Sequence, residues 1–145
     1  MRTTVRRVAL MLLLTSLPAE SGASIDYCAM FTRKQIETAL GKPVKAGHAP
    51  PLTSDACQWD AVDGKGVVHI TAYFAGIWND LSGRSSQRSV PGVGEKAYIG
   101  PAAEGGVQAG AVSGEAFYIV HLNPAPNDHQ VIDLLRAVVA RSHGK

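Results

Sequence analysis

The sequence predicts an α+β domain, with an antiparallel sheet of about five strands flanked by an N-terminal and a C-terminal helix. One helical pattern stands near the start, at residues 32–41, and a second begins at Asn127. Between them lie short strand-like runs separated by turns rich in glycine. The 145 residues, 46% of them hydrophobic and 18% charged, suit one folded domain and are too apolar for a disordered protein.

Residues 1–23 have the pattern of a secretory signal peptide. Arginines without an acid open the chain, an apolar run follows at 8–14, and small residues fit a cleavage site after Ala23. The apolar run is too short for a membrane helix, which needs about 20 residues. We therefore expect a periplasmic or secreted protein without a membrane span, whose mature domain is residues 24–145.

The charge balance argues against nucleic acid as a partner. The chain has 14 Lys and Arg against 12 Asp and Glu, and the leader holds three of those bases and one of those acids. Bases and acids therefore balance in the mature chain, which lacks the basic surplus that phosphate binding requires.

Both cysteines, Cys28 and Cys57, lie in the mature chain. An even count in an exported protein favours a disulfide, because metal sites need more ligands and redox pairs usually stand two residues apart. The residues before Cys28 do not form a lipid-attachment signal. Trp59 shares strand parity with Cys57 and should pack beside the bridge.

The first helix is predicted by its ends. Thr32 can cap the amide of Gln35 while Gln35 reaches back, and Phe31 can pack on Ile36. Gly41 is suited to end the helix.

Residues 56–61 and 67–74 are predicted to form the first hairpin. Alternation in its second strand predicts a core-facing set and a more polar set. The core-facing set is Val68, Ile70, Ala72 and Phe74, and the other is Val67, His69, Thr71 and Tyr73.

The remaining elements follow in order. Residues 76–89 are predicted to be a long loop, 96–99 a short strand, and 107–112 with 116–122 a second hairpin. Asn127 can cap the closing helix, whose apolar stripe is Val131, Leu134, Leu135, Val138 and Val139.

The motifs in the sequence do not indicate a catalytic activity. Residues 92–97 match the letters of a dinucleotide-binding loop, but a strand-like segment follows where a helix is needed, so a tight turn is the better interpretation. No phosphate-binding loop or serine nucleophile elbow is present in the sequence. We expect no cofactor and no catalytic residue.

Two histidines remain as candidates. His69 and His121 lie on predicted strands and, with Asp60, could form the site of a periplasmic hydrolase or metal-dependent enzyme. The favoured alternative is that both are hydrogen-bonded strand histidines without a metal, because no close-spaced ligand pair supports one.

Binding candidates lie in the predicted loop. Trp78, Arg84 and Arg88 belong to residue types that often anchor interfaces, and His69 with Tyr73 would lie on the adjoining sheet face. The alternative is that Trp78 tucks under the loop as a lid on the sheet, since large aromatics are seldom exposed on soluble domains.

Several segments occur in a suggestive order: Cys28, a helix ending in Leu40-Gly41, a C-x-W strand at 57–59, and a V-P-G-x-G-x-x-A-Y turn at 90–98. This order resembles a family of small exported bacterial domains of unknown function, often lipoproteins. Its layout is similar to that of extracellular sensor domains of bacterial receptor kinases and of PsbP-like folds. The resemblance implies helices packed on an antiparallel sheet, a Cys28–Cys57 bridge and no established catalytic residues.

We therefore expect an exported, non-catalytic binding protein. Its partner would be another protein or a small ligand in the cell envelope, and an immunity or inhibitor protein is the narrower form of this hypothesis.

Overall fold

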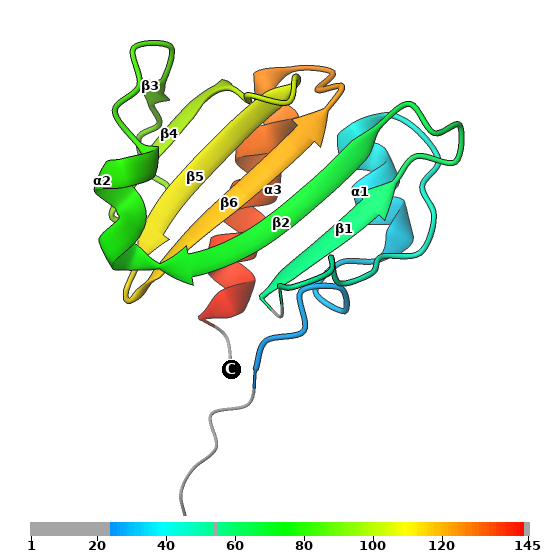
Figure 1. Cartoon of the computed structure of the whole chain (residues 1–145), viewed down its shortest axis with the longest axis horizontal. Helices are drawn as coiled ribbons and strands as arrows, with labels where there is room; N and C mark the ends of the chain where they lie inside the picture. The colour runs from blue at the N-terminus through cyan, green and yellow to red at the C-terminus, as the bar shows by residue number, and fades with distance from the viewer. Residues whose placement is uncertain (1–23, 54, 144–145) are drawn as a thin grey trace, which may run out of the picture.

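The fold is α+β, as predicted. A computed structural model describes residues 24–53 and 55–143, in which six antiparallel strands form one sheet in the order β1-β2-β6-β5-β4-β3 (Figure 1). The sheet has one strand more than the five expected. The predicted signal peptide at 1–23 lies outside the described residues. No helix in the described part of the chain is both long and apolar enough to cross a membrane.

The elements follow one another as short helices and hairpins. In chain order they are α1 (Arg33–Leu40), β1 (Ala56–Asp60), β2 (Val67–Phe74), the 3₁₀ turn η1 (Ala75–Ile77), α2 (Trp78–Leu81), β3 (Arg88–Ser89), β4 (Lys96–Pro101), β5 (Val107–Ser113), β6 (Ala116–Asn123) and α3 (Asp128–Ser142).

The ends of α1 are fixed by local hydrogen bonds, as its sequence predicts. The Thr32 hydroxyl accepts a bond from the Gln35 amide while the Gln35 side chain accepts one from the Thr32 amide. Gly41 ends the helix in the left-handed region, at φ 73°. A side chain there would be strained, which is why glycine is suited to this position.

The closing helix α3 is capped in the same way. The Asn127 side chain accepts a bond from the Gln130 amide, and the Gln130 side chain accepts one from the Asn127 amide. The predicted cap is confirmed, and the reciprocal bond from Gln130 completes it.

The sheet buries one face under α1 and α3, which both lie behind it in Figure 1. Each fully buried aliphatic side chain in this layer stabilises the fold by about 1.5–3 kcal/mol. The largest fully buried side chains between helices and sheet include Ile36, Leu40, Trp59, Ile70, Ile99, Leu122 and Leu135.

Among residues 24–53 and 55–143, helices cover the opposite face at one end only. There η1 and α2 pack over a small cluster formed by Tyr98, Val112, Phe117 and Ile119. No helix from the described part of the chain covers the rest of this face (Figure 1), so side chains that point from it are free to form a site.

The predicted disulfide joins Cys28, which precedes α1, to Cys57 in β1. Trp59 lies buried beside it, and Gly47 packs over both. A Cβ atom at Gly47 would stand 2.5 Å from the Trp59 Nε1 and 2.8 Å from the Cys57 Sγ. No larger residue fits without moving the indole or the bridge.

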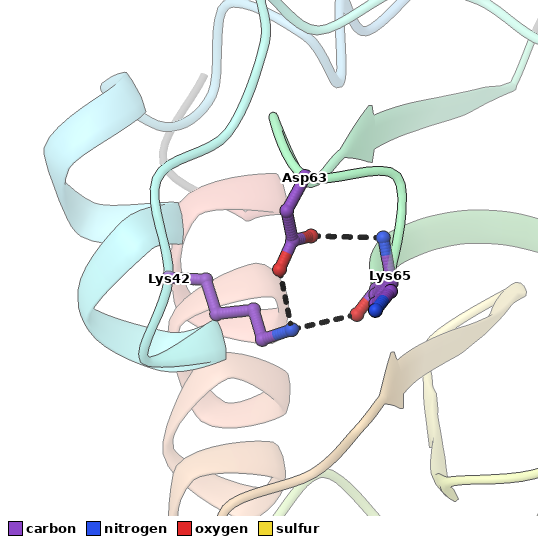
Figure 2. A network of polar contacts seen from close by, with 3 residues as sticks. All are labelled: Lys42, Asp63 and Lys65. Carbon is purple, nitrogen blue, oxygen red and sulfur yellow. Dashed lines mark hydrogen bonds and ion pairs between the residues drawn. The ribbon is translucent and has the colours of Figure 1, made fainter.

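A polar network fastens the end of α1 to the β1–β2 turn (Figure 2). The Lys42 Nζ donates to the Asp63 Oδ2 at 3.0 Å and to the Lys65 carbonyl at 2.8 Å. The Lys65 amide donates to the Asp63 Oδ1 at 2.8 Å, and this bond, with the Lys42 ammonium, lowers the pKa of the Asp63 carboxyl. The hairpin is therefore held to the helix layer at this corner.

Two sequence predictions for residues 74–89 are wrong. The segment expected to be a loop contains α2 and β3, which are too short to show a periodic pattern. Phe74, expected in the core, is 72% exposed. It lies beyond Thr71, the last residue of β2 that pairs with β1, so the sheet is narrower around it.

Candidate functional site

A cleft of about 280 Å³ lies beside α2, on the face of the sheet opposite α1 and α3. Its floor is formed by β2, β6 and β5, and its walls by the segment between α2 and β3 and by the loop between β4 and β5. The lining side chains are His69, Thr71, Tyr73, Leu81, Arg84, Gln87, Pro101, Ala102, Ala103, Glu104, Gln108, Ile119 and His121.

The floor is a polar row that crosses three strands. Antiparallel pairing places His69 of β2 directly opposite His121 of β6, and His121 opposite Gln108 of β5. Directly opposed residues point to the same face of a sheet, so the three side chains adjoin. The site is thus built where β2 and β6 join the two hairpins.

His121 holds one wall in place. Its Nε2 lies 2.7 Å from the Gly105 carbonyl, and a carbonyl only accepts, so this nitrogen carries the proton. The Asn123 side chain donates to the Glu104 carbonyl at 3.3 Å. Gly106 lets this loop lie against β6, because a Cβ there would stand 2.2 Å from the Leu122 carbonyl. These contacts fix Glu104 at the rim.

His69 is held in its neutral form. Burial lowers the pKa of its imidazole and the adjacent His121 lowers it further, while the Glu104 carboxylate opposes this in part. The His69 Nε2 is shielded from solvent and has no hydrogen-bond partner among the described residues. A bare lone pair in that place is less unfavourable than a buried, unbonded N–H, so the neutral ring with its proton on Nδ1 fits best.

Gln87 organises the other wall. Its side-chain amide donates to the Leu81 carbonyl at 3.1 Å, and its side-chain oxygen accepts from the Arg84 amide at 3.3 Å. The Gln87 amide donates to the Arg84 carbonyl at 2.9 Å. This turn fastens Arg84 to the end of α2.

Arg84 and Glu104 are the two side chains in the lining that carry a full charge at neutral pH. Neither forms an ion pair or a side-chain hydrogen bond with the described parts of the chain. Burial raises the pKa of the Tyr98 phenol on β4, whereas a hydrogen bond from Gln108 and the charge of Arg84 lower it. Arg84 belongs to the segment between α2 and β3, and Glu104 to the loop between β4 and β5. The two charges therefore come from different walls of the cleft.

The structure brings three of the five predicted binding residues together. His69, Tyr73 and Arg84 all line the cleft. Tyr73 is 42% exposed, so its ring is accessible from solvent.

The other two predicted binding residues, Trp78 and Arg88, do not line the cleft and contact other residues. Trp78 packs on Phe117 and Tyr98, with ring centroids 5.2 and 5.6 Å apart, and the Lys96 ammonium lies 5.0 Å from its ring centre. It is the lid that the alternative interpretation described. Arg88 pairs with Asp128 of α3, at the helix-covered side of the sheet, and does not line the cleft.

Asp60 does not join the two histidines. It accepts a bond from the Gln58 side chain at 2.8 Å, and its Oδ2 lies 3.9 Å from the His48 Nε2. Among residues 24–53 and 55–143, no group of three or more His, Cys, Asp or Glu side chains is placed to hold a metal ion.

Sequence reasoning missed Gln87, Glu104 and Gln108. Gln108 had a detectable signal, because it is a polar residue in the otherwise apolar run from Val107 to Val112. Glu104 and Gln87 had none, since a charge or an amide in a loop is ordinary.

Comparison with known proteins adds no relative. No protein-family model matches the chain, and neither a curated protein nor a solved structure does so. The resemblance drawn from short motifs therefore rests on those motifs alone.

Proposed function

We propose that the protein is an exported, non-catalytic binding protein that holds a small polar ligand in the cleft on the sheet face opposite α1 and α3. The observation that carries this proposal is the gathering of His69, Tyr73 and Arg84, from two separate segments, around one recess. Recessed sites with a few converging polar groups are the usual form of small-molecule sites.

Export is supported by two features. The leader-like pattern at 1–23 is typical of secreted chains, and a disulfide such as Cys28–Cys57 is consistent with an extracellular or periplasmic location.

The shape of the site favours a small ligand over a protein partner. A volume of about 280 Å³ is close to the lower end of typical ligand pockets, which begin at roughly 300 Å³. An immunity or inhibitor protein would instead present a broad face, and the large aromatic predicted to anchor such a face, Trp78, packs on Phe117 and Tyr98.

Filling the cleft tests the proposal. Ala103 lines the recess and is exposed, so Ala103→Trp adds an indole there without disturbing the core. The purified protein is dialysed against a small-molecule extract of envelope fractions and examined by native mass spectrometry. We expect a small-molecule adduct on the wild type that is lost in Ala103→Trp.

Ala140→Trp is the matched control, because Ala140 is exposed on α3 and lies outside the cleft. It should keep the adduct. If the wild type carries no adduct, or if Ala103→Trp carries the same adduct, the cleft is not a binding site and the proposal is wrong.

A further inference from the structure

The cleft presents one positive and one negative group on two different walls. Arg84 and Glu104 come from different loops, and the Arg84 guanidinium and Glu104 carboxylate lie too far apart for an ion pair. Opposite charges that share a recess without pairing are each free to bind a group of a ligand. An anion alone would be repelled by Glu104, and a cation alone by Arg84.

The floor between these walls is polar. Gln108 is an uncharged amide, His121 is bonded to the Gly105 carbonyl, and the pKa of His69 is lowered, which favours its neutral form. His69 and Gln108 therefore do not favour one charge on the ligand over the other.

The lining also has an apolar part. Leu81, Ile119 and Pro101 contribute to it, and Tyr73 adds an accessible ring. A ligand with a short side chain of low polarity beside its charges would contact these groups.

We infer that the cleft binds a zwitterion, namely a free α-amino acid or a short peptide with both ends unblocked. Its carboxylate binds Arg84 and its ammonium binds Glu104. Arginine is well suited to this role, because its planar guanidinium can donate two parallel bonds to a carboxylate. This inference rests on the proposed function, since it names the ligand class for the same cleft.

The test uses paired probes. The nitrogen-15-labelled protein is titrated with L-alanine, L-leucine, L-glutamine and the dipeptide alanyl-leucine, and amide shifts of the cleft residues are followed. N-acetyl-L-leucine, which lacks the ammonium, and L-leucine methyl ester, which lacks the carboxylate, are titrated in parallel. We expect at least one zwitterion to bind, and its singly charged derivatives to bind roughly tenfold more weakly.

Two variants assign each end of the ligand. Arg84→Gln should weaken zwitterion binding and remove the preference over the methyl ester, whereas Glu104→Gln should remove the preference over the N-acetyl form. Arg33→Gln and Glu115→Gln change the same residue types at exposed positions outside the cleft and should leave binding unchanged. Alanyl-leucine against the free amino acids separates a peptide ligand from an amino acid.

The outcomes separate this inference from the proposed function. If the protein takes up an adduct that Ala103→Trp abolishes, yet no zwitterion shifts the cleft amides, the cleft is a binding site and the zwitterion inference is overturned. Equal binding of the blocked derivatives would overturn it too. If no small molecule binds in either experiment, both proposals fail.

Discussion

His69 shows how a residue's surroundings, more than its type, decide what it can do. Its position in an alternating strand predicts the more polar face of the sheet, which the structure confirms by placing it in the cleft floor. Its protonation could not be predicted, because it depends on burial and on His121, which lies 52 positions later but directly opposite. Contacts between distant segments are not encoded in a local pattern.

The neutral state of His69 predicts a loss of stability in mild acid. Its pKa in the folded protein lies below the ordinary value of 6.5, so the unfolded chain takes up a proton first as the pH falls. Stability is therefore present at neutral pH and decreases as the pH falls through about 6.5 towards the folded-state pKa. We expect His69→Gln to show a smaller decrease in unfolding free energy than the wild type between about pH 7.5 and pH 5.5.

Urea denaturation at the two pH values measures this difference. His129→Gln removes a histidine that is exposed at the start of α3 and controls for the general loss of an imidazole. Equal pH dependence in the wild type and in His69→Gln would show that His69 is not the group responsible.

At the scale of elements, α1, α3 and the two hairpins could be predicted, whereas α2 and β3 could not. Capping residues and alternation mark α1, β2 and α3 in the sequence. The four-residue α2 and the two-residue β3 have no such pattern. They form because Trp78 packs on Phe117 and Tyr98 and because Arg88 and Ser89 pair with β4. Tertiary contacts decide their structure.

Removing the Trp78 side chain should loosen one wall of the cleft. Trp78→Ala deletes the ring that holds α2 to the sheet, and we expect the free energy of unfolding to fall by about 2–3 kcal/mol, below the value for a fully buried tryptophan. Gln87 holds Arg84 to the end of α2, so ligand binding should weaken as well. Denaturation monitored by circular dichroism measures the free energy of unfolding, and titration with the zwitterions named above measures ligand binding.

Phe74→Ala is the matched control in the same region. Phe74 is an aromatic residue at the end of β2 but is 72% exposed, so its loss should change stability by less than about 1 kcal/mol. A similar effect of the two substitutions would contradict the assignment of Trp78 as the lid.

At the scale of the whole molecule, the site depends on how the two hairpins join. The sequence predicts each hairpin, but the pairing of β2 with β6 brings together residues far apart in the chain. That pairing completes the row of His69, His121 and Gln108 on the face opposite α1 and α3. A different strand order with the same hairpins would have scattered these side chains, so the cleft could be predicted only in part.

The disulfide ties the edge strand β1 to the segment before α1. β1 is an edge strand, bonded to β2 on one side and only to short segments on the other, where His48 exchanges backbone bonds of 3.0 and 2.9 Å with Gln58. The Cys28–Cys57 bond spans 29 positions, and closing such a loop stabilises the folded state by about 3.5 kcal/mol through the entropy of the unfolded chain.

We therefore expect the double variant Cys28→Ala/Cys57→Ala to unfold with a free energy about 2–5 kcal/mol lower than the wild type. Cys57 is fully buried beside Trp59, so the cavity left by its sulfur adds to the lost cross-link. Denaturant titration of the oxidised wild type, the reduced wild type and the variant measures both contributions. Reduction breaks the S–S bond but leaves both sulfur atoms in place, whereas the variant also lacks the sulfur atoms. Hydrogen exchange should show the earliest loss of protection in β1 and slow exchange retained in β6, which lies inside the sheet. Two free thiols per chain in the denatured, unreduced protein would show instead that the bridge does not form.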